Sequence, residues 1–168
     1  SFLRKKTAEE IQAVFAPKIF GAFHLDEQTR DVDLDFFVMF SSLAAIGGNA
    51  GQCDYSFANH YLDSFAARRE ALRAGGQRAG RTLSLNWSLW ADGGMKLDQA
   101  TEAFFRKSLG IKPLNKDVGL EAFVSALSSE RAQLAVLEGV PAKIEQAWGL
   151  VKKQTAVAPV EVRQAGGR

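Results

Sequence analysis

Two stretches that read as buried strands most constrain how this chain can fold, because a long helical pattern separates them. Residues 36–40 form a continuous apolar run, Phe-Phe-Val-Met-Phe, and residues 82–87 read Thr-Leu-Ser-Leu-Asn-Trp. A run like the first is typical of a strand buried on both faces of a parallel sheet, and we expect the second stretch to be another buried strand. From Phe57 to Ala66, apolar residues recur at helical spacing, as a crossover between parallel strands requires. The sequence therefore predicts an α/β fold with a parallel sheet and flanking helices.

Helix-start and helix-stop signals outline the remaining elements. Thr7 and Glu10 match a capping box, and Pro17 should kink the helix that follows or begin a second piece. Asp54 is a plausible N-cap for the crossover helix, which Gly75 should end. The last expected elements are a helix over residues 98–109, a helix from Asn115 or Lys116 to Leu127, and a strand from Gln133 to Leu137.

Composition narrows the classes of partner. With 168 residues, 46% of them hydrophobic and 24% charged, the chain suits one globular domain with a sizeable core. The net charge is only +2 and no dense stripe of Lys and Arg occurs, so binding to nucleic acid is not expected. No apolar run approaches the roughly 20 residues that a membrane span needs.

Cysteine usage and the first residues bear on location. The single cysteine, Cys53, excludes an internal disulfide and fits a reducing compartment, so a cytoplasmic location is expected. No basic segment followed by an apolar leader opens the chain. Because the first residue is Ser1 and not methionine, we expect the sequence to be an excised segment that begins within a larger fold.

Four residues carry candidate chemistry: Lys18, Ser42, Tyr55 and Asn59. A tyrosine hydroxyl can protonate a carbonyl oxygen during reduction if a nearby ammonium lowers its pKa from about 10. Lys18 can supply that ammonium. Ser42, at the end of an expected strand, can donate a hydrogen bond to the same oxygen and stabilise the developing alkoxide. Asn59 lies one helical turn after Tyr55 and can hold a water or backbone group of a proton path.

The positions of the lysine and the asparagine resemble those in a known protein family. Most short-chain dehydrogenases/reductases have Tyr-x-x-x-Lys on this helix, whereas here Asn59 takes the fourth position and Lys18 lies upstream. This exchange, with Asn86-Trp87-Ser88-Leu89-Trp90 and Gly93-Gly94-Met95, resembles the ketoreductase domains of bacterial modular type I polyketide synthases. These motifs are most similar to those of synthases whose acyltransferase acts in trans. The resemblance implies a Rossmann-like sheet.

The resemblance also implies a reaction. The substrate would be a β-ketoacyl chain on the phosphopantetheine arm of an acyl carrier protein, NADPH would give the hydride, and a β-hydroxyacyl thioester would result. Neighbouring synthase domains would be further partners. Lys18, Tyr55 and Ser88 would contact the cofactor. The residues expected near the substrate are Gly47, Gln52, Trp90 and Met95.

One stereochemical expectation follows from the same family. Ketoreductases that form an L-hydroxyl usually carry a tryptophan at the position that Gly47 occupies here. The aspartate marker of the opposite type would fall at or just before Ser1. The resemblance therefore favours a D-hydroxyl product.

The cofactor half of the site is missing from this pattern. The family binds NADPH through a G-x-G-x-x-G turn that opens a helix after a first strand. Gly47, Gly48 and Gly51 have the wrong spacing and follow Ser42, so we interpret them as an active-site loop. The first strands are thus expected to precede Ser1, which leaves an incomplete fold and an inactive fragment.

The expected division of the chain follows. Residues 1–139 are interpreted as the C-terminal catalytic part of a ketoreductase domain, and residues 140–168 as a trailing helix and linker. His24 and His60 share no ligand spacing with Cys53, so no metal site is expected.

Two other functions compete with the reductase. Synthases contain truncated ketoreductase-like subdomains that only brace the catalytic half, but these usually lack the tyrosine, serine and lysine together. A free-standing dehydrogenase for a small alcohol is disfavoured by the exchanged positions of Lys18 and Asn59. Singly, each of the four residues would be read as ordinary packing or surface, so the interpretation depends on their conjunction.

Overall fold

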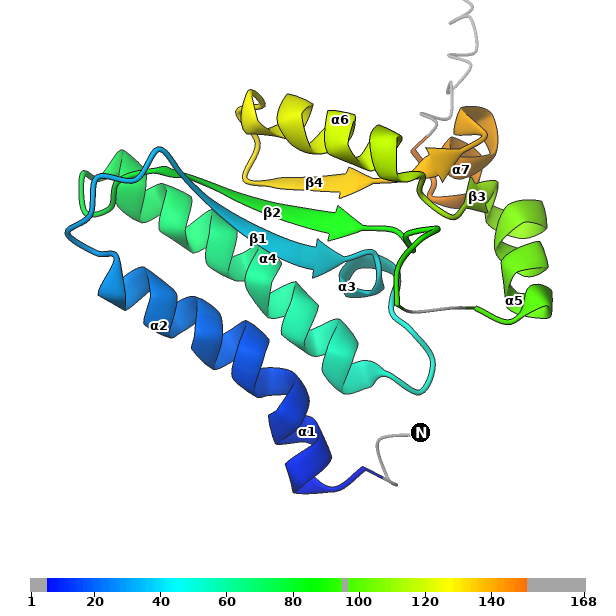
Figure 1. Cartoon of the computed structure of the whole chain (residues 1–168), viewed down its shortest axis with the longest axis horizontal. Helices are drawn as coiled ribbons and strands as arrows, with labels where there is room; N and C mark the ends of the chain where they lie inside the picture. Colours follow the sequence, from blue (N-terminus) through cyan, green and yellow to red (C-terminus); the bar gives the residue numbers. More distant parts are fainter. Residues whose placement is uncertain (1–5, 95–96, 151–168) are drawn as a thin grey trace, which may run out of the picture.

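A three-stranded parallel sheet with helices on both faces forms the centre of the molecule (Figure 1). The structure is a computed structural model and describes residues 6–94 and 97–150. The strands are β1 (Phe36–Ser42), β2 (Arg81–Trp87) and β4 (Gln133–Val136), in the order β1-β2-β4. The predicted parallel sheet with flanking helices is confirmed for these residues.

Helices cover the sheet unequally. Helices α2 (Gly21–Gln28) and α4 (Cys53–Ala74) lie against one face, and α6 (Lys116–Leu127) lies on the other, over β2 and β4 (Figure 1). Two apolar clusters result. The first consists of Ala22, Phe37, Met39, Leu62, Phe65 and Ala66. The second consists of Leu83, Leu85, Trp87, Leu114, Ala126 and Val136.

The first helical segment is continuous through Pro17. Helix α1 (Ala8–Phe15) begins with the predicted capping box of Thr7 and Glu10. A π-helical turn, η2 (Ala16–Phe20), then carries the chain into α2 without a break. Pro17 lies in the first turn of this segment, where its missing amide hydrogen is tolerated. The predicted change at Pro17 takes the form of a π-helical turn within one continuous helical segment, and Lys18 lies on that turn.

Two sequence predictions were wrong in detail. Asp54 is not the N-cap of α4, because Gln52 takes that place and Asp54 is buried within the first turn, paired with Lys6. Strand β1 is not buried on both faces: Phe37 and Met39 are buried, whereas Phe36 and Phe40 are more than half exposed. The reason is that β1 is the edge strand and α6 covers mainly β2 and β4.

Smaller elements complete the described part. Helix α3 (Ala44–Gly47) follows β1, and α5 (Gln99–Phe104) continues into the π-helical turn η3 (Phe105–Leu109), as the prediction for 98–109 requires. Strands β3 (Ile111–Lys112) and β5 (Glu138–Gly139) form an antiparallel pair that the sequence did not indicate. Helix α7 (Pro141–Ala147) follows. Within the described residues, no helix has the length and apolar character that crossing a membrane requires.

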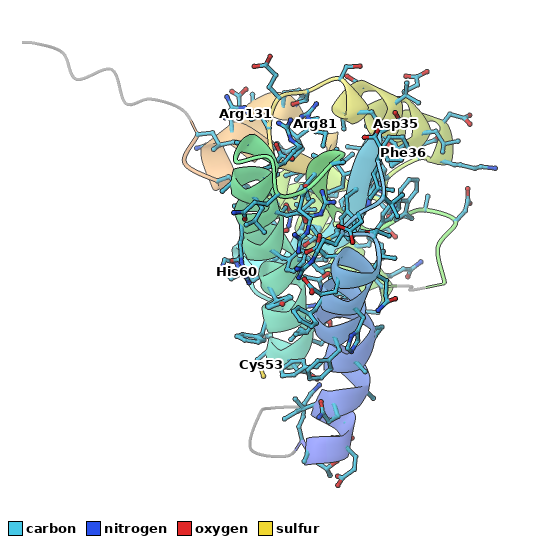
Figure 2. All side chains as sticks on the ribbon, turned by 90° about the vertical axis from the view of Figure 1, so that its left-hand side faces the viewer. Asp35, Phe36, Cys53, His60, Arg81 and Arg131 are labelled. Atoms are coloured by element: carbon cyan, nitrogen blue, oxygen red, sulfur yellow. The ribbon has the colours of Figure 1, made fainter. Side chains whose placement is uncertain are left out.

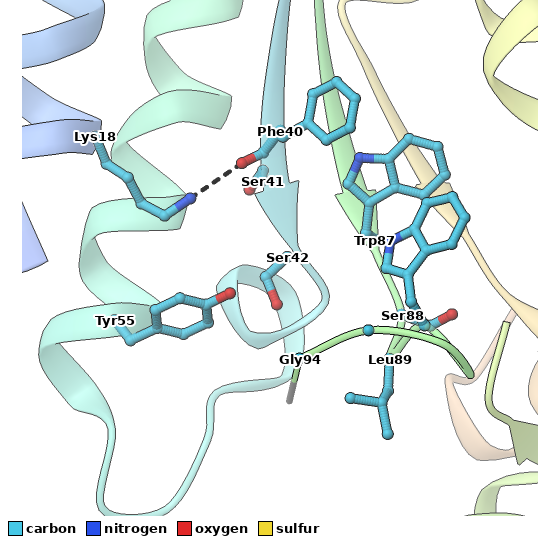
Figure 3. Close-up of a pocket in the computed structure, with 11 residues that line it drawn as sticks. Lys18, Phe40, Ser41, Ser42, Tyr55, Trp87, Ser88, Leu89 and Gly94 are labelled. Carbon is cyan, nitrogen blue, oxygen red and sulfur yellow. Dashed lines mark hydrogen bonds between the residues drawn. The ribbon is translucent and has the colours of Figure 1, made fainter. Parts of the chain in front are cut away.

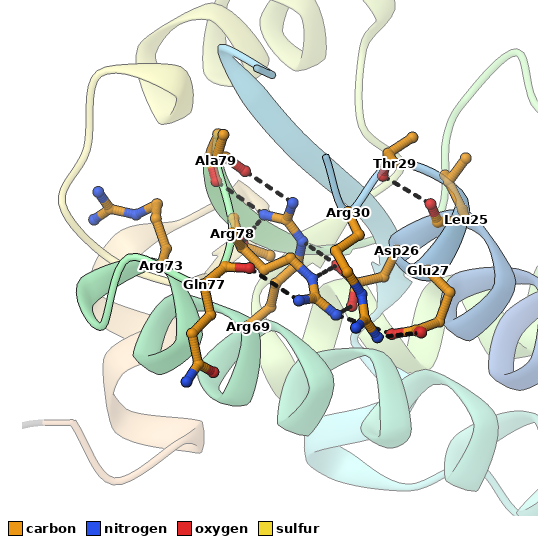
Figure 4. Close-up of polar contacts among 12 residues, drawn as sticks. Leu25, Asp26, Glu27, Thr29, Arg30, Arg69, Arg73, Gln77, Arg78 and Ala79 are labelled. Atoms are coloured by element: carbon orange, nitrogen blue, oxygen red, sulfur yellow. Dashed lines mark hydrogen bonds and ion pairs between the residues drawn. The ribbon is translucent and has the colours of Figure 1, made fainter. Parts of the chain in front are cut away.

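An ion cluster lies at the amino end of β2, next to Thr82 (Figure 4). The buried Arg69 guanidinium of α4 donates to Asp26 of α2 at 2.7 Å and to the Thr82 hydroxyl at 2.8 Å. Arg78 donates to both oxygens of the same carboxylate at 3.0 Å. These charge-assisted bonds hold the pKa of Asp26 below its usual value against the opposing effect of burial. The cluster joins α2, α4 and β2 at one end of the sheet.

Figure 2 shows the molecule from the side and places Phe36 at the end of the sheet opposite to Cys53, which begins α4. His60 projects outward from the same helix. Among residues 6–94 and 97–150, no group of three or more His, Cys, Asp or Glu side chains gathers as metal ligands.

Candidate active site

The two neighbouring strands β1 and β2 end side by side. They run parallel in a register that pairs Ser42 with Trp87, and the Leu43 amide donates to the Trp87 carbonyl at 3.0 Å. A pocket of about 390 Å³ opens at this edge. Ligands of parallel sheets bind beyond the carboxyl ends of the strands, so the pocket occupies the expected place.

Tyr55 and Ser42 face each other across the pocket. Figure 3 shows the Tyr55 ring, carried by the first turn of α4, directed towards Ser42 at the end of β1. Both side chains are half-buried. The Ser42 hydroxyl oxygen accepts from the Ala44 amide at 3.2 Å, and no described residue accepts its hydrogen. That hydrogen is therefore available to a ligand in the pocket.

Lys18 reaches the same pocket from the π-helical turn. Its ammonium donates to the Phe40 carbonyl at 3.0 Å and lies 5.7 Å from the centroid of the Tyr55 ring (Figure 3). Burial lowers the pKa of Lys18 from its usual value, because the charged form loses hydration, and the negative charge of Asp63 partly opposes this shift. The ammonium thus stands beside the tyrosine ring with one backbone acceptor.

Asn59 lies beneath the pocket and not in its wall. Its side chain is fully buried, one helical turn after Tyr55, and its amide nitrogen donates to the Tyr55 carbonyl at 2.8 Å. The amide oxygen has no hydrogen-bond partner among the described residues. A buried acceptor without a partner is costly, so this atom is suited to bind a water or another donor.

Comparison with known proteins decides the family. A model described as the KR domain matches residues 1–92, more than half of the chain. Polyketide synthase PksN of Bacillus subtilis (strain 168) is 44% identical over 165 residues, which is 98% of this chain. Polyketide synthase ThaG of Burkholderia thailandensis is 45% identical over 148 residues, or 88% of this chain. The chain belongs to the KR domain family.

Solved ketoreductases share the fold. A crystal structure of a ketoreductase domain from the bacillaene assembly line matches with a TM-score of 0.82 and 43% identity, covering 87% of this chain and 35% of that chain. An N-terminal ketoreductase from the macrolactin assembly line matches with a TM-score of 0.74 and 42% identity, covering 87% and 27%. The chain spans about a third of such structures and 3% of PksN and of ThaG. The predicted membership among polyketide synthase ketoreductases is confirmed.

The ketoreductase site has the parts that protonation of a carbonyl requires. A carbonyl oxygen placed between Tyr55 and Ser42 would meet two hydroxyl donors, and the Lys18 ammonium adds positive charge beside them. Preplaced donors stabilise the negative charge that develops on the oxygen. The spacing of the three residues in sequence therefore corresponds to a single constellation in space.

The other predicted residues are placed less uniformly. Ser88 and Trp90 line the pocket, and the buried Ser88 hydroxyl has no hydrogen-bond partner in the part of the chain that the structure describes. Gly47 ends α3, and Gln52 precedes α4 and accepts from the Asn49 side chain at 2.8 Å; neither lines the pocket. Met95 lies outside the described residues.

Trp90 forms a fixed wall of the ketoreductase pocket. The Ala91 amide donates to the Leu114 carbonyl at 2.9 Å, and the Leu114 amide donates to the Leu89 carbonyl at 2.7 Å, which pins the backbone around Trp90. Its indole packs against Trp87 at 4.8 Å between centroids and its outer edge rests on Gly119 of α6. A Cβ at Gly119 would overlap that ring, so glycine is required for the observed position.

Sequence reasoning missed a buried polar group behind the pocket. Asp63 accepts from the Asn86 side chain at 2.8 Å, and Asn86 also donates to the Ser42 carbonyl at 3.1 Å. The signal was present, because Asp63 interrupts the apolar stripe of α4 between Leu62 and Ala66. A charged residue on a buried helix face needs a partner, and the search for one leads to the strand ends.

Proposed function

We propose that this chain is the proton-delivering part of a ketoreductase that converts a β-ketoacyl thioester to a β-hydroxyacyl thioester during polyketide biosynthesis. The observation that carries the proposal is the meeting of Tyr55, Ser42 and the Lys18 ammonium at one pocket. A truncated bracing subdomain has no need of this arrangement. The catalytic interpretation is therefore preferred over a structural one.

Each residue has a distinct role in this proposal. Tyr55 donates its proton to the carbonyl oxygen, and Ser42 holds that oxygen with the hydroxyl hydrogen that no described residue accepts. The positive charge of Lys18 favours the phenolate that Tyr55 leaves behind. The free amide oxygen of Asn59 holds a water that returns a proton towards the site.

The nucleotide end of the site fits a nicotinamide cofactor in part. NADPH supplies the hydride when it is bound. Lys18 and Tyr55 offer donors for its ribose, and Ser88 lines the pocket at the strand end. No G-x-G-x-x-G occurs in these 168 residues, so the pyrophosphate must be held by chain outside them. We assign only the nicotinamide side to this segment.

The partners follow from the family. An acyl carrier protein would present the β-ketoacyl chain on its phosphopantetheine arm, and other synthase domains would flank residues 1–139, with residues 140–168 trailing them. The reducing environment suggested by the lone Cys53 suits a cytoplasmic synthase. The absence of a tryptophan at Gly47 favours a D-hydroxyl in the product.

Tyr55→Phe in the complete ketoreductase domain tests the proposal, because it removes only the hydroxyl that gives the proton. We expect the rate of β-ketoacyl thioester reduction, followed by NADPH absorbance, to fall at least about a hundredfold, the size of a general-acid contribution. The matched control is Tyr61→Phe on the same helix, whose ring packs against Phe65 outside the pocket lining.

Two results would contradict the proposal. If Tyr55→Phe keeps wild-type turnover, Tyr55 is not the proton donor. If the complete wild-type domain fails to reduce any β-ketoacyl thioester with NADPH, the bracing role becomes the better interpretation. Equal losses in Tyr55→Phe and Tyr61→Phe would point to a folding defect and would also count against the assigned role.

A further inference from the structure

A carboxylate that the proposed reaction does not use lies behind the pocket. Asp63 stands on α4, one turn after Asn59, and only 5% of it is exposed. Its two oxygens accept from the Ser84 hydroxyl at 2.7 Å and from the Asn86 amide nitrogen at 2.8 Å, both on β2. Burial of a carboxylate is costly unless such partners satisfy it. The side chain is therefore fully engaged, and its partners show what it does.

Hydrogen bonds of the Asn86 side chain connect Asp63 to β1. Its nitrogen lies 3.1 Å from the Ser42 carbonyl and 3.0 Å from the Ser41 hydroxyl, and its oxygen accepts from Gln133 at 2.9 Å. A carboxylate and a carbonyl can only accept hydrogen bonds. If the amide were flipped, its oxygen would face both the Asp63 carboxylate and the Ser42 carbonyl. Asp63 thus acts with the Ser42 carbonyl and Gln133 to set which end of Asn86 points at Ser42.

The same network holds the helix to the strand. The Ser41 hydroxyl donates to the Asn59 backbone carbonyl at 3.1 Å, so the turn of α4 between Tyr55 and Asn59 is tied to the residue before Ser42. Hydrogen bonds therefore connect both proposed donors, Ser42 on the strand and Tyr55 on the helix, to the same buried Asn86 amide. A shift of about 1 Å between catalytic groups can lower a rate about a hundredfold.

We propose that Asp63 is a positioning residue of this ketoreductase, which holds Ser42 in register with Tyr55 through the orientation of the Asn86 amide. The proposal rests on the proposed function for the reaction it serves. Stability alone does not call for a carboxylate here, because an apolar residue on a buried helix face is commonly as stable as a buried charge.

The test compares three variants of the complete ketoreductase domain. Asp63→Ala removes both acceptors. Asp63→Asn keeps one acceptor and can keep both hydrogen bonds, because the new amide oxygen can face Asn86 while its nitrogen donates to a reoriented Ser84 hydroxyl. Ser64→Ala changes the next, exposed residue of α4 and serves as the control. Should Asp63→Ala not fold, Asp63→Ser replaces it, because serine is too short to reach Asn86.

We expect Asp63→Ala to lower kcat about 10- to 100-fold with KM nearly unchanged, since misplacement of Ser42 is felt in the transition state. Asp63→Asn should stay within about threefold of the wild type, as should Ser64→Ala. Independently of activity, hydrogen exchange of the amides of residues 41–44 should accelerate in Asp63→Ala alone, because the strand end loses its tie.

The outcomes separate the ideas. Wild-type kcat in Asp63→Ala, unchanged exchange at residues 41–44, or a loss in Asp63→Asn as large as that in Asp63→Ala would each overturn the positioning role. A wild-type domain that reduces no β-ketoacyl thioester would count against the proposed function instead. The exchange measurement would then still decide whether Asp63 holds the end of β1.

Discussion

Lys18 carries its ammonium into the pocket from a π-helical turn, and this placement has an energetic consequence. The side chain is half-buried, with the Phe40 carbonyl as its one hydrogen-bond partner among the described residues. Burial lowers the pKa of Lys18 from its usual value of 10.5, and the charge of Asp63 only partly restores it. A charged group in this position is held at some cost to folding, as residues of active sites often are.

The pKa shift predicts a pH-dependent stability. At pH below the folded-state pKa, both folded and unfolded chains hold the proton, and folding bears the full cost of burying the charge. As the pH rises through the lowered folded-state pKa, the folded chain releases its proton first, so stability increases. We therefore expect Lys18→Met to be more stable than the wild type at neutral pH in urea unfolding of the complete domain. The difference should shrink as the pH approaches about 10.

A matched variant isolates this effect from the general titration of the protein. Lys116, an exposed residue at the start of α6, can be changed to methionine for comparison. The difference between Lys116→Met and the wild type should vary little with pH. A difference for Lys18→Met that stays constant between neutral and alkaline pH would contradict the assigned burial of the ammonium.

At the scale of single elements, the sequence predicted the positions of helices and strands better than it predicted the surroundings of individual residues. The apolar stripe from Phe57 to Ala66 located α4, the apolar run of residues 36–40 located β1, and residues 82–87 were correctly interpreted as the strand β2. The N-cap of α4 was misplaced because Asp54, a favoured capping residue, turns inward to pair with Lys6, a contact between distant residues. Exposure of Phe40 could not be predicted either, since it depends on where α6 lies.

In the candidate site, too, some residues were predicted from the sequence and others were missed. Lys18, Ser42 and Tyr55 were brought together as predicted, because their spacing matches one family pattern. The Asp63 and Asn86 pair was missed, since nothing local marks an asparagine on β2 as the partner of a carboxylate on α4. Pairs of this kind can be recognised only from the three-dimensional structure.

The contact between α6 and Trp90 gives a prediction at this scale. Gly119→Ala would place a methyl group against the indole and 3.2 Å from Leu114, so the ring must move towards the pocket while its backbone stays pinned. Overpacking of this kind destabilises by about 1–3 kcal/mol. We also expect kcat/KM to fall more for α-branched than for unbranched β-ketoacyl thioesters, because the pocket narrows.

A second substitution makes this prediction sharper. Adding Trp90→Phe removes the part of the ring that meets the new methyl group, so the double variant should regain stability and tolerance of branched substrates relative to Gly119→Ala. Val118→Ala, at the neighbouring exposed position, should alter neither quantity. Equal losses for both substrate classes in Gly119→Ala would show that Trp90 does not border the acyl chain.

At the scale of the whole molecule, the sheet has one open side. Strand β1 is its edge within the described residues, its own Phe36 and Phe40 are exposed, and the matched ketoreductase structures are about three times as long as the aligned part. A long edge with exposed aromatic residues is a ready site for further strand pairing. The described sheet thus has an edge at which a further strand could pair.

Cofactor binding tests this view directly. Because the 168 residues contain no G-x-G-x-x-G turn, we expect the isolated chain to bind NADPH at least about a hundredfold more weakly than the complete domain in calorimetry. Circular dichroism must first show that the isolated chain is folded. Equal affinities would mean that the pyrophosphate is held by residues of this segment, contrary to the assignment made for them.

The ion cluster of Asp26, Arg69 and Arg78 has a consequence for the history of such a protein. It secures the amino end of β2, whereas the pocket lies at the carboxyl end of the same strand. Substitutions at distant sites have nearly additive effects. Substitutions that change the substrate range at one end of the sheet can therefore accumulate without lowering the stability that the ion cluster provides at the other end. This arrangement makes the protein readily evolvable.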